Sequence, residues 1–266
     1  MNKFKDITVI VSFLVIIFSP TIFYNLFRDY IKIENTENRE LASKPDLTVK
    51  NYLTYSKDYE SYYNDNLPFR TQLKKMWSSI NADIFNISTN DSVMIGKDGW
   101  LFYTGDGTIE QLTGKLKFSD DEISNITTKF KNWQDKFEEK GIGFYLLILP
   151  NKENIYRKYL PDVIYKNNNI SRTEKLYDAL KDKDINIVYP KEQLQNSKYL
   201  SYYKHDTHWN KYGAYLGFCE LQKMILENNY ECKVSINREL VSTGDLKTMA
   251  NLSGKYQTEM TYGIND

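Results

Sequence analysis

The longest apolar stretch of the chain lies at its N-terminus. No charged residue occurs from Ile7 to Phe27, a stretch long enough for an α-helix to cross a bilayer. Lys3 and Lys5 precede it, which predicts that the N-terminus faces the cytoplasm and that the rest of the chain lies outside. No Ala-x-Ala cleavage site follows, so the pattern favours an uncleaved anchor over a removed signal peptide. We expect residues 1–30 to form a signal anchor.

The part that follows has weaker patterns. Residues 31–45 are polar and unpatterned, as expected of a tether, and mixed helical spacing over 51–86 predicts one or two helices. A Gly/Asp turn beside an aromatic run at 95–103 predicts a hairpin or a short strand pair. We therefore assign residues 31–118 to a linker and an N-terminal flanking region.

Helix and strand patterns alternate from residue 119 onward. Capping boxes, in which a Ser is followed three residues later by a Glu, mark the first two helices. The apolar run 142–149 is unbroken, which is typical of a central strand buried on both faces. The elements expected in order are a helix from Ser119 to Gly141, the strand 142–149, a helix from Ser171, a strand at 185–188 and a helix capped by Asn210.

This alternation predicts an α/β fold in which helices cover a central parallel sheet. We expect residues 119–266 to form that domain. Two strands are too few for a stable sheet of this kind, and residues 235–266 offer no third apolar run. Either the early segment contributes strands, or the sheet is incomplete at the C-terminus.

Composition narrows the function classes. The 35 basic and 35 acidic residues balance, which leaves no electrostatic footprint for nucleic acid. Two cysteines cannot form a disulfide scaffold or a four-thiolate zinc site. A disulfide between Cys219 and Cys232 and two free thiols are equally compatible with the sequence. No motif predicts a cofactor.

Both histidines of the chain lie in the segment 203–210, just before a predicted helix. An Asp two residues before a His can bring its carboxylate to the imidazole Nδ1, which fixes the tautomer and leaves Nε2 free as a general base. Asp206 and His208 are therefore the candidate catalytic pair. The alternative is a solvated histidine pair in an aromatic loop. A metal site through His205, Asp206 and His208 is not predicted, because no further ligands are in view to complete it.

A base of this kind needs a nucleophile, ordinarily a Ser on a Gly-containing turn after a strand. The sequence has no G-x-S-x-G motif and no Gly-Asp-Ser. Ser235, Ser242 and Ser253 lie downstream, but none follows an apolar strand, and Ser242 and Ser253 are more typical of caps and turns.

The chain resembles the SGNH-hydrolase-like proteins of the alginate O-acetylation type, the AlgX and AlgJ group, and their relatives named for an Asp-His-His-Trp motif. The resemblance covers nearly all of the chain beyond the anchor. It rests on motifs in the family's order, namely Glu37-Asn38-Arg39 with Leu41 and Pro45, Leu67-Pro68-Phe69-Arg70, residues 96–102, Leu146 to Lys152 with Tyr156 and Leu160-Pro161, Asp206-Thr207-His208-Trp209, and Gly244-Asp245-Leu246.

The resemblance implies an SGNH-like three-layer sandwich with Asp206 as the orienting carboxylate and His208 as the base. The family's serine takes an acetyl group and passes it to a hydroxyl of an exported polysaccharide, and a membrane-bound acyltransferase is the expected donor. That serine lies beyond the Gly-Asp-Leu segment, after a further strand. We therefore expect a C-terminally truncated form of a longer enzyme, or else a rearranged stand-alone domain.

Residues near the dyad are weaker candidates for substrate binding. Trp209 could stack on a sugar ring or anchor the loop by packing. Lys152 and Tyr156 follow the first predicted strand and are placed to line a cleft, although a Lys there is ordinarily solvated. The leading expectation is a membrane-anchored extracytoplasmic O-acetyltransferase-like protein. The alternatives are a carbohydrate esterase and a non-catalytic polysaccharide-binding or scaffold protein.

Overall fold

The computed structural model describes residues 3–27, 40–166, 169–227 and 229–265. The chain divides into two compact units, residues 1–77 and 78–266. Most of the predicted tether at 31–45, including the Glu37-Asn38-Arg39 motif, lies outside the described residues.

The first unit is helical. Helix α1 (Lys3–Phe27) contains the predicted apolar segment, with Pro20 inside it. Within the described part of the chain it is the one helix apolar and long enough to cross a membrane, with a mean hydropathy of 2.2 over Phe4–Phe23 and none of that window buried. Two further helices, α2 (Tyr55–Asp65) and α3 (Arg70–Ile80), confirm the prediction for 51–86.

The second unit begins at Ser78 and includes the predicted strand pair. Strands β1 (Val93–Ile95) and β2 (Leu101–Tyr103) are antiparallel. They lie inside the fold, since Leu101 and Phe102 are 0% exposed. The compact unit therefore extends further toward the N-terminus than the boundary at residue 119 that the sequence suggested, because this strand pair supplies core.

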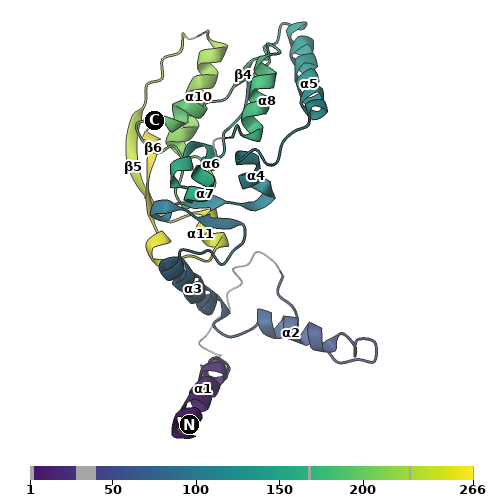
Figure 1. Cartoon of the computed structure of the whole chain (residues 1–266), viewed down its shortest axis with the longest axis vertical. Helices are drawn as coiled ribbons and strands as arrows, with labels where there is room; N and C mark the ends of the chain where they lie inside the picture. The colour runs from purple at the N-terminus through teal and green to yellow at the C-terminus, as the bar shows by residue number, and fades with distance from the viewer. Residues whose placement is uncertain (1–2, 28–39, 167–168, 228, 266) are drawn as a thin grey trace. The chain divides into compact units, whose positions relative to one another are not determined.

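A parallel strand pair and its helices form the α/β part of the unit. Strand β3 (Leu146–Leu147) pairs with β4 (Ile187–Val188). Side chains of α5 (Asp120–Glu138) and α8 (Arg172–Lys181) pack with this pair in one apolar cluster. Helix α10 (Lys211–Ile225) also contacts β4 (Figure 1). Both predicted capping boxes are present, at Ser119 with Glu122 and at Ser171 with Glu174.

The prediction of a central strand buried on both faces at 142–149 is wrong. The strand is short, and Ile142, Tyr145 and Leu149 are 50%, 37% and 42% exposed. The strand is not central in a sheet, because within the described residues only one strand, β4, pairs with β3. In the part of the chain that the structure describes, no strand pairs with the other edge of β3.

The C-terminal segment forms strands although it lacks a continuous apolar run. Strands β5 (Ser235–Val241) and β6 (Glu259–Asn265) are antiparallel, with Val241 opposite Glu259. Along β6 the buried residues Glu259, Thr261 and Gly263 alternate with more exposed ones. An antiparallel pair covered on one face needs only this alternation, so residues 235–265 form strands although they contain no third apolar run.

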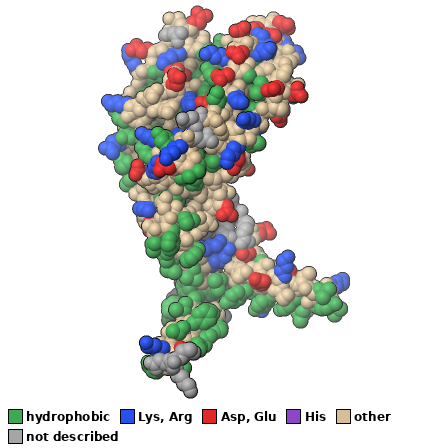
Figure 2. Space-filling view, viewed as in Figure 1, with side chains coloured by type: hydrophobic (Ala, Val, Ile, Leu, Met, Phe, Trp, Pro, Cys, Tyr) green, Lys and Arg blue, Asp and Glu red, His purple; other side chains and the backbone are tan. Residues whose placement is uncertain are grey.

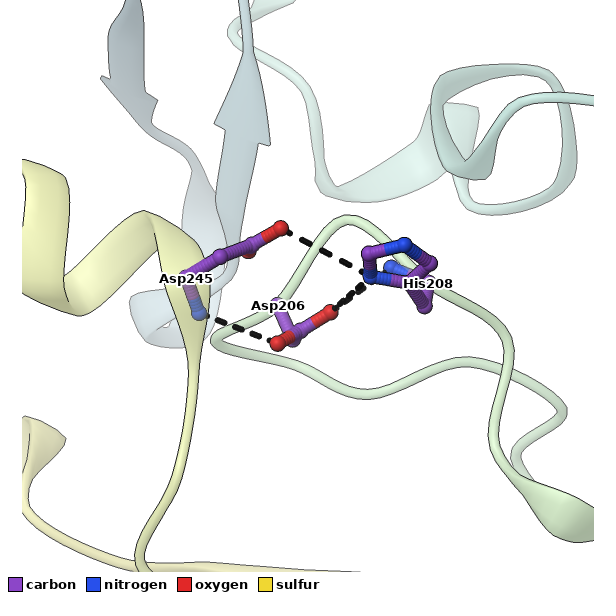
Figure 3. A group of neighbouring side chains, drawn as sticks. All are labelled: Asp206, His208 and Asp245. Atoms are coloured by element: carbon purple, nitrogen blue, oxygen red, sulfur yellow. Dashed lines mark hydrogen bonds and ion pairs between the residues drawn. The ribbon is translucent and has the colours of Figure 1, made fainter.

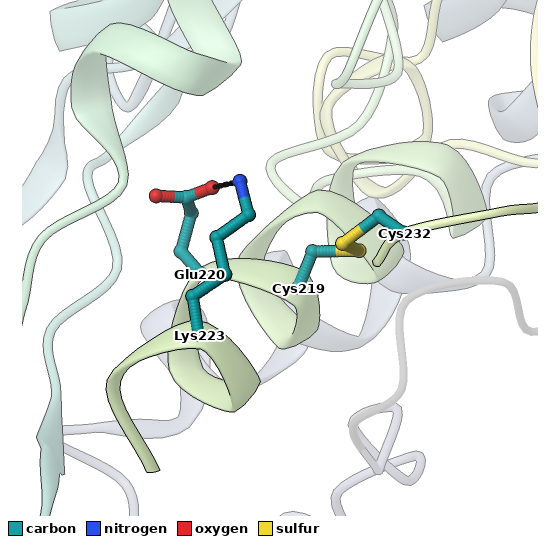
Figure 4. Close-up of a disulfide and its surroundings, with 4 residues drawn as sticks. All are labelled: Cys219, Glu220, Lys223 and Cys232. Carbon is teal, nitrogen blue, oxygen red and sulfur yellow. Dashed lines mark hydrogen bonds and ion pairs between the residues drawn. A yellow bond between two sulfur atoms is a disulfide. The ribbon is translucent and has the colours of Figure 1, made fainter. Parts of the chain in front are cut away.

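The remaining elements are short helices, and one disulfide closes a loop. Cys219 of α10 is bonded to Cys232, with Cα atoms 5.9 Å apart, and Glu220 and Lys223 form an ion pair on the same helix (Figure 4). The short helices are α4 (Thr108–Leu112), α6 (Lys152–Ile155), α7 (Asp162–Tyr165), α9 (Lys191–Gln195) and α11 (Asp245–Met249).

The surface charges of the second unit are mixed. On the face drawn in Figure 2, basic and acidic side chains are interspersed over this unit with no extended field of one sign. This distribution agrees with the balanced composition.

Candidate active site on the loop before helix α10

The segment that carries both histidines is a closed loop at the start of α10. Tyr202 and Trp209 form an isolated bridge, and the amide of Tyr203 donates to the carbonyl of His208 at 3.2 Å. Asn210 caps α10 by accepting a hydrogen bond from the Gly213 amide at 2.8 Å. The sequence folds this way because an Asn at the N-cap ends the loop and starts the helix.

Asp206 and His208 are brought together as the spacing predicts. The Asp206 Oδ1 lies 2.7 Å from His208 Nδ1, and the same oxygen accepts the His208 amide at 2.9 Å (Figure 3). The second carboxylate oxygen accepts the amide of Asp245 at 3.0 Å. The carboxylate is thus fixed on both sides and faces the Nδ1 side of the ring.

These contacts favour the ionised form of Asp206. Partial burial on its own raises the pKa of this carboxyl group. The hydrogen bonds from the His208 and Asp245 amides and from the His208 ring outweigh burial and lower the pKa below its usual value. Asp206 therefore stays an anion in the range where histidine titrates.

His208 presents its other nitrogen to solvent. Its side chain is 74% exposed, and Nε2 has no hydrogen-bond partner among the residues that the structure describes. Beside the ring lies a hollow of about 200 Å³, formed by Leu149, Pro150 and Asn151 after β3 and by Tyr202, Thr207, His208 and Trp209 of the loop. The open nitrogen therefore lies beside the carboxyl end of a parallel strand, where sites of α/β proteins gather.

Lys152 lies beneath the loop and not on the wall of a cleft. It is 1% exposed, and its Nζ donates to the carbonyl oxygens of Tyr203, Lys204 and Asp206 at 3.3, 3.3 and 2.6 Å. Burial lowers its pKa to about 8, an effect that nearby carboxylates oppose. The expected contact with substrate is replaced by support of the loop backbone.

Tyr156 is also interior. It is 6% exposed, and its hydroxyl accepts the Ser201 amide at 2.7 Å. It packs on Trp100 with ring centroids 4.5 Å apart. Trp209 is half-buried, lines the hollow beside His208 and packs against Gly217, so a role with substrate stays a prediction for this residue.

Glu259 of β6 holds the other side of the loop backbone. Its carboxylate accepts the amides of Lys204 and His205, the latter at 2.9 Å. Burial raises the pKa of Glu259, and these two amides oppose the rise. Carbonyls of the loop thus face Lys152, while amides of the same loop face Glu259.

His205 is separate from the candidate pair. It is 3% exposed, and burial together with Lys204, Lys152 and Lys247 lowers its pKa to about 4. His205 therefore does not join Asp206 and His208 in one cluster of potential metal ligands. Asp245 takes that place, with its ligand atoms and those of Asp206 and His208 within 4.8 Å of one another, but amides and a hydroxyl already occupy these carboxylates.

The downstream serines lie away from His208 in different local structures, with Ser235 at the start of β5 and Ser242 in the segment after it. Ser253 is the N-cap of a 3₁₀ turn, and its hydroxyl is bonded to that of Ser79 at 2.8 Å. In the part of the chain that is described, no serine hydroxyl is bonded to the His208 ring. Thr207 is the neighbouring hydroxyl, and it contacts Nδ1 at 3.2 Å, not Nε2.

Reasoning from the sequence missed two acidic partners of this site, Asp245 and Glu259. Each lies 38 or more residues from the loop amide that it binds. Gly244-Asp245-Leu246 was noticed as a motif without a role, whereas nothing in the pattern of β6 distinguishes Glu259 from a surface acid.

A carboxylate at Nδ1 of a histidine with an open Nε2, beside a parallel strand of an α/β unit, is the arrangement of serine hydrolases and acyltransferases that use an Asp-His pair. Residues 93–261 match a family model described as an SGNH hydrolase-like domain, acetyltransferase AlgX. The chain belongs to this family, and its α/β fold is of the SGNH type.

Curated relatives are alginate acetylation proteins by name. A probable alginate O-acetylase AlgJ of Pseudomonas syringae pv. tomato is 27% identical over 210 residues, 74% of this chain and 51% of that protein. The AlgJ of Pseudomonas aeruginosa is 24% identical over 102 residues, 38% of this chain and 24% of that protein. The chain therefore spans about half or less of the length of these relatives.

The matching solved structures share a lower sequence identity with this chain than the curated relatives do. The O-acetyltransferase domain of Pseudomonas putida AlgJ has a TM-score of 0.41 and 18% identity, with 66% of each chain covered. Bacillus cereus PatB1, solved with a sulfonyl adduct, has a TM-score of 0.45 and 17% identity, covering 67% of this chain and 57% of that one.

Proposed function

We propose that the chain is an O-acetyltransferase-like protein that acts on an exported or cell-envelope polysaccharide, with Asp206 orienting His208 as the general base. The observation that carries the proposal is the 2.7 Å contact between Asp206 Oδ1 and His208 Nδ1, with Nε2 open beside the hollow. The family assignment supports acetyl transfer, and the names of the relatives support a polysaccharide acceptor.

In this proposal His208 removes the proton of a nucleophilic hydroxyl through Nε2. The resulting imidazolium is stabilised by the anion at Nδ1. The hydroxyl oxygen bonds to the acetyl carbon of the donor ester as the bond from that carbon to the donor oxygen breaks, and the imidazolium gives its proton to the leaving donor oxygen. Among the described residues, no serine hydroxyl is bonded to the His208 ring. A multispanning acyltransferase of the membrane is the proposed acetyl donor.

Membrane anchoring through α1 with the second unit on the outer side belongs to the same proposal. The apolar window of α1 supports it, and so does the disulfide, which is stable in oxidising compartments outside the cytoplasm.

A scaffold or polysaccharide-binding protein is the second candidate, because no serine hydroxyl contacts the His208 ring in the described residues. Incubating the full chain with p-nitrophenyl acetate and soluble alginate separates the candidates. Acetyl groups on the alginate support a transferase. Release of acetate alone supports an esterase, and binding of alginate without turnover supports the scaffold.

A further inference from the structure

The motif Gly244-Asp245-Leu246 lies directly against the candidate pair. We propose that Asp245 is a positioning residue, which holds the turn Asp206-Thr207-His208 and keeps the proton of the neutral His208 ring on Nδ1. The catalytic consequence rests on the proposed function, whereas the structural part of the inference does not.

The hydrogen bonds between the two segments run in both directions. The Asp245 amide donates to Asp206 Oδ2 at 3.0 Å (Figure 3). In return, Asp245 Oδ1 accepts the Thr207 amide at 2.8 Å, and Asp245 Oδ2 accepts the Thr207 hydroxyl. Each segment therefore satisfies polar groups of the other, which fixes the turn more firmly than a one-way contact would.

The charge of Asp245 adds to that of Asp206. Asp245 Oδ2 lies 3.6 Å from His208 Nδ1, which is too long for a hydrogen bond but close enough for electrostatic attraction. Both carboxylates thus lie on the Nδ1 side of the ring. They favour a proton on Nδ1, and that tautomer leaves the Nε2 lone pair free to act as a base.

The neighbours of Asp245 explain how it reaches the loop. A Cβ at Gly244 would lie 2.6 Å from the His205 carbonyl oxygen, so only a glycine allows this approach. Leu246 is 0% exposed and packs in the core with Ile95 and Leu101, which fixes the start of α11. The Lys247 amide donates to the His205 carbonyl at 3.3 Å and ties the same turn to the loop.

The competing explanation is that Asp245 only caps its own helix. Its Oδ1 also accepts the Leu246 amide at 2.6 Å, a local contact that an Asn could keep. The two explanations differ in what Asp245→Asn changes. Loss of the charge leaves a cap intact, but it weakens the link to Thr207 and the bias on the His208 ring.

Histidine-selective NMR of the full chain in detergent micelles tests the proposal. Because the chain has only two histidines, the two ring signals can be assigned with His208→Gln. In Asp245→Asn we expect the share of the Nε2–H tautomer of neutral His208 to rise at least about twofold. We also expect exchange of the Thr207 amide to accelerate about tenfold or more.

Internal and matched controls accompany this measurement. The His205 amide, bonded to Glu259, serves as the internal control and keeps its exchange rate. Thr207→Val, which removes the hydroxyl partner of Asp245, reproduces part of the effect. Asp182→Asn, at the exposed C-cap of α8, changes neither readout.

An unchanged tautomer and an unchanged Thr207 exchange rate in Asp245→Asn would overturn the proposal and leave Asp245 as a cap. If Asp245→Asn fails to fold by circular dichroism, Thr207→Val alone decides. Neither readout needs turnover, so a wild-type chain without acetyl transfer contradicts the proposed function and leaves this inference intact. Where turnover is present, we expect kcat to fall with KM unchanged.

Discussion

The two segments that meet at the candidate site reverse the usual relation between polarity and burial. The loop 201–210 is rich in polar residues, yet Ser201, His205 and Asn210 are 0%, 3% and 1% exposed. The segment 142–149 is wholly apolar around its glycine, yet several of its side chains are exposed. The comparison shows that burial here follows the available partners. Lys152, Glu259 and Asp245 satisfy the loop backbone, whereas β3 has one strand partner in the described chain.

The largest effect is expected at Lys152. Lys152→Met keeps the volume but leaves the carbonyl oxygens of Tyr203 and Asp206 without their donor, whereas the Lys204 carbonyl still accepts the Leu101 amide. It also removes the cation beside two buried carboxylates, Glu153 and Glu259. We expect a loss of about 3 to 5 kcal/mol in the free energy of unfolding, measured by urea unfolding of the full chain. The control is Lys158→Met, on the exposed side chain of the next turn, which changes stability by about 0.5 kcal/mol or less. Equal losses of unfolding free energy in Lys152→Met and Lys158→Met would contradict the claim that Lys152 supports the buried polar loop.

The second effect is a pH dependence that comes from His205. Its pKa is lowered to about 4 in the folded chain, so between about pH 6.5 and pH 4 the unfolded chain binds more protons at this residue. Stability is therefore present above pH 6.5 and decreases as the pH falls toward 4, by up to about 3 kcal/mol.

The measurement is the free energy of unfolding at pH 7 and at pH 4.5 for the wild type and His205→Gln. Carboxylates away from the His205 ring contribute to both proteins alike, so the difference between the two slopes reports His205 together with Glu259, whose Oε1 lies 3.9 Å from the ring Nδ1. A slope that is the same in both proteins would place the His205 ring in water, against its 3% exposure.

The smallest effect is expected at the exposed Leu149, which follows β3. Leu149→Ser replaces a side chain that is 42% exposed, so it changes the free energy of unfolding by about 1 kcal/mol or less. Leu180→Ser, at a fully buried residue of the adjoining cluster, is the matched control and costs several times more. A loss of more than about 2 kcal/mol in Leu149→Ser would mean that another segment covers this edge.

Local sequence signals predicted much of the fold. The capping boxes at Ser119 and Ser171, the N-cap at Asn210 and the apolar run of α1 each depend on neighbouring residues, and each element is present. The error at 142–149 arose because an apolar run shows what a strand can bury, not how many strands pair with it. The antiparallel pair of β5 and β6 was missed because alternating burial needs no apolar run.

The candidate site was predictable only where its parts are close in sequence. The two-residue spacing of Asp206 and His208 predicted their contact. The supports of the loop come from β6, α6 and α11, and their roles depend on tertiary folding. Lys152 and Tyr156 were expected to line a cleft because they follow the first predicted strand. They are interior because the loop offers them backbone partners.

The most direct test of the central claim is acetyl-ester turnover by the full chain, compared with His208→Gln and His205→Gln at equal folded fractions. If Asp206 and His208 form the acid–base pair, turnover falls about a hundredfold or more in His208→Gln and stays within a few fold of the wild type in His205→Gln. Equal turnover in the wild type and His208→Gln would contradict the claim.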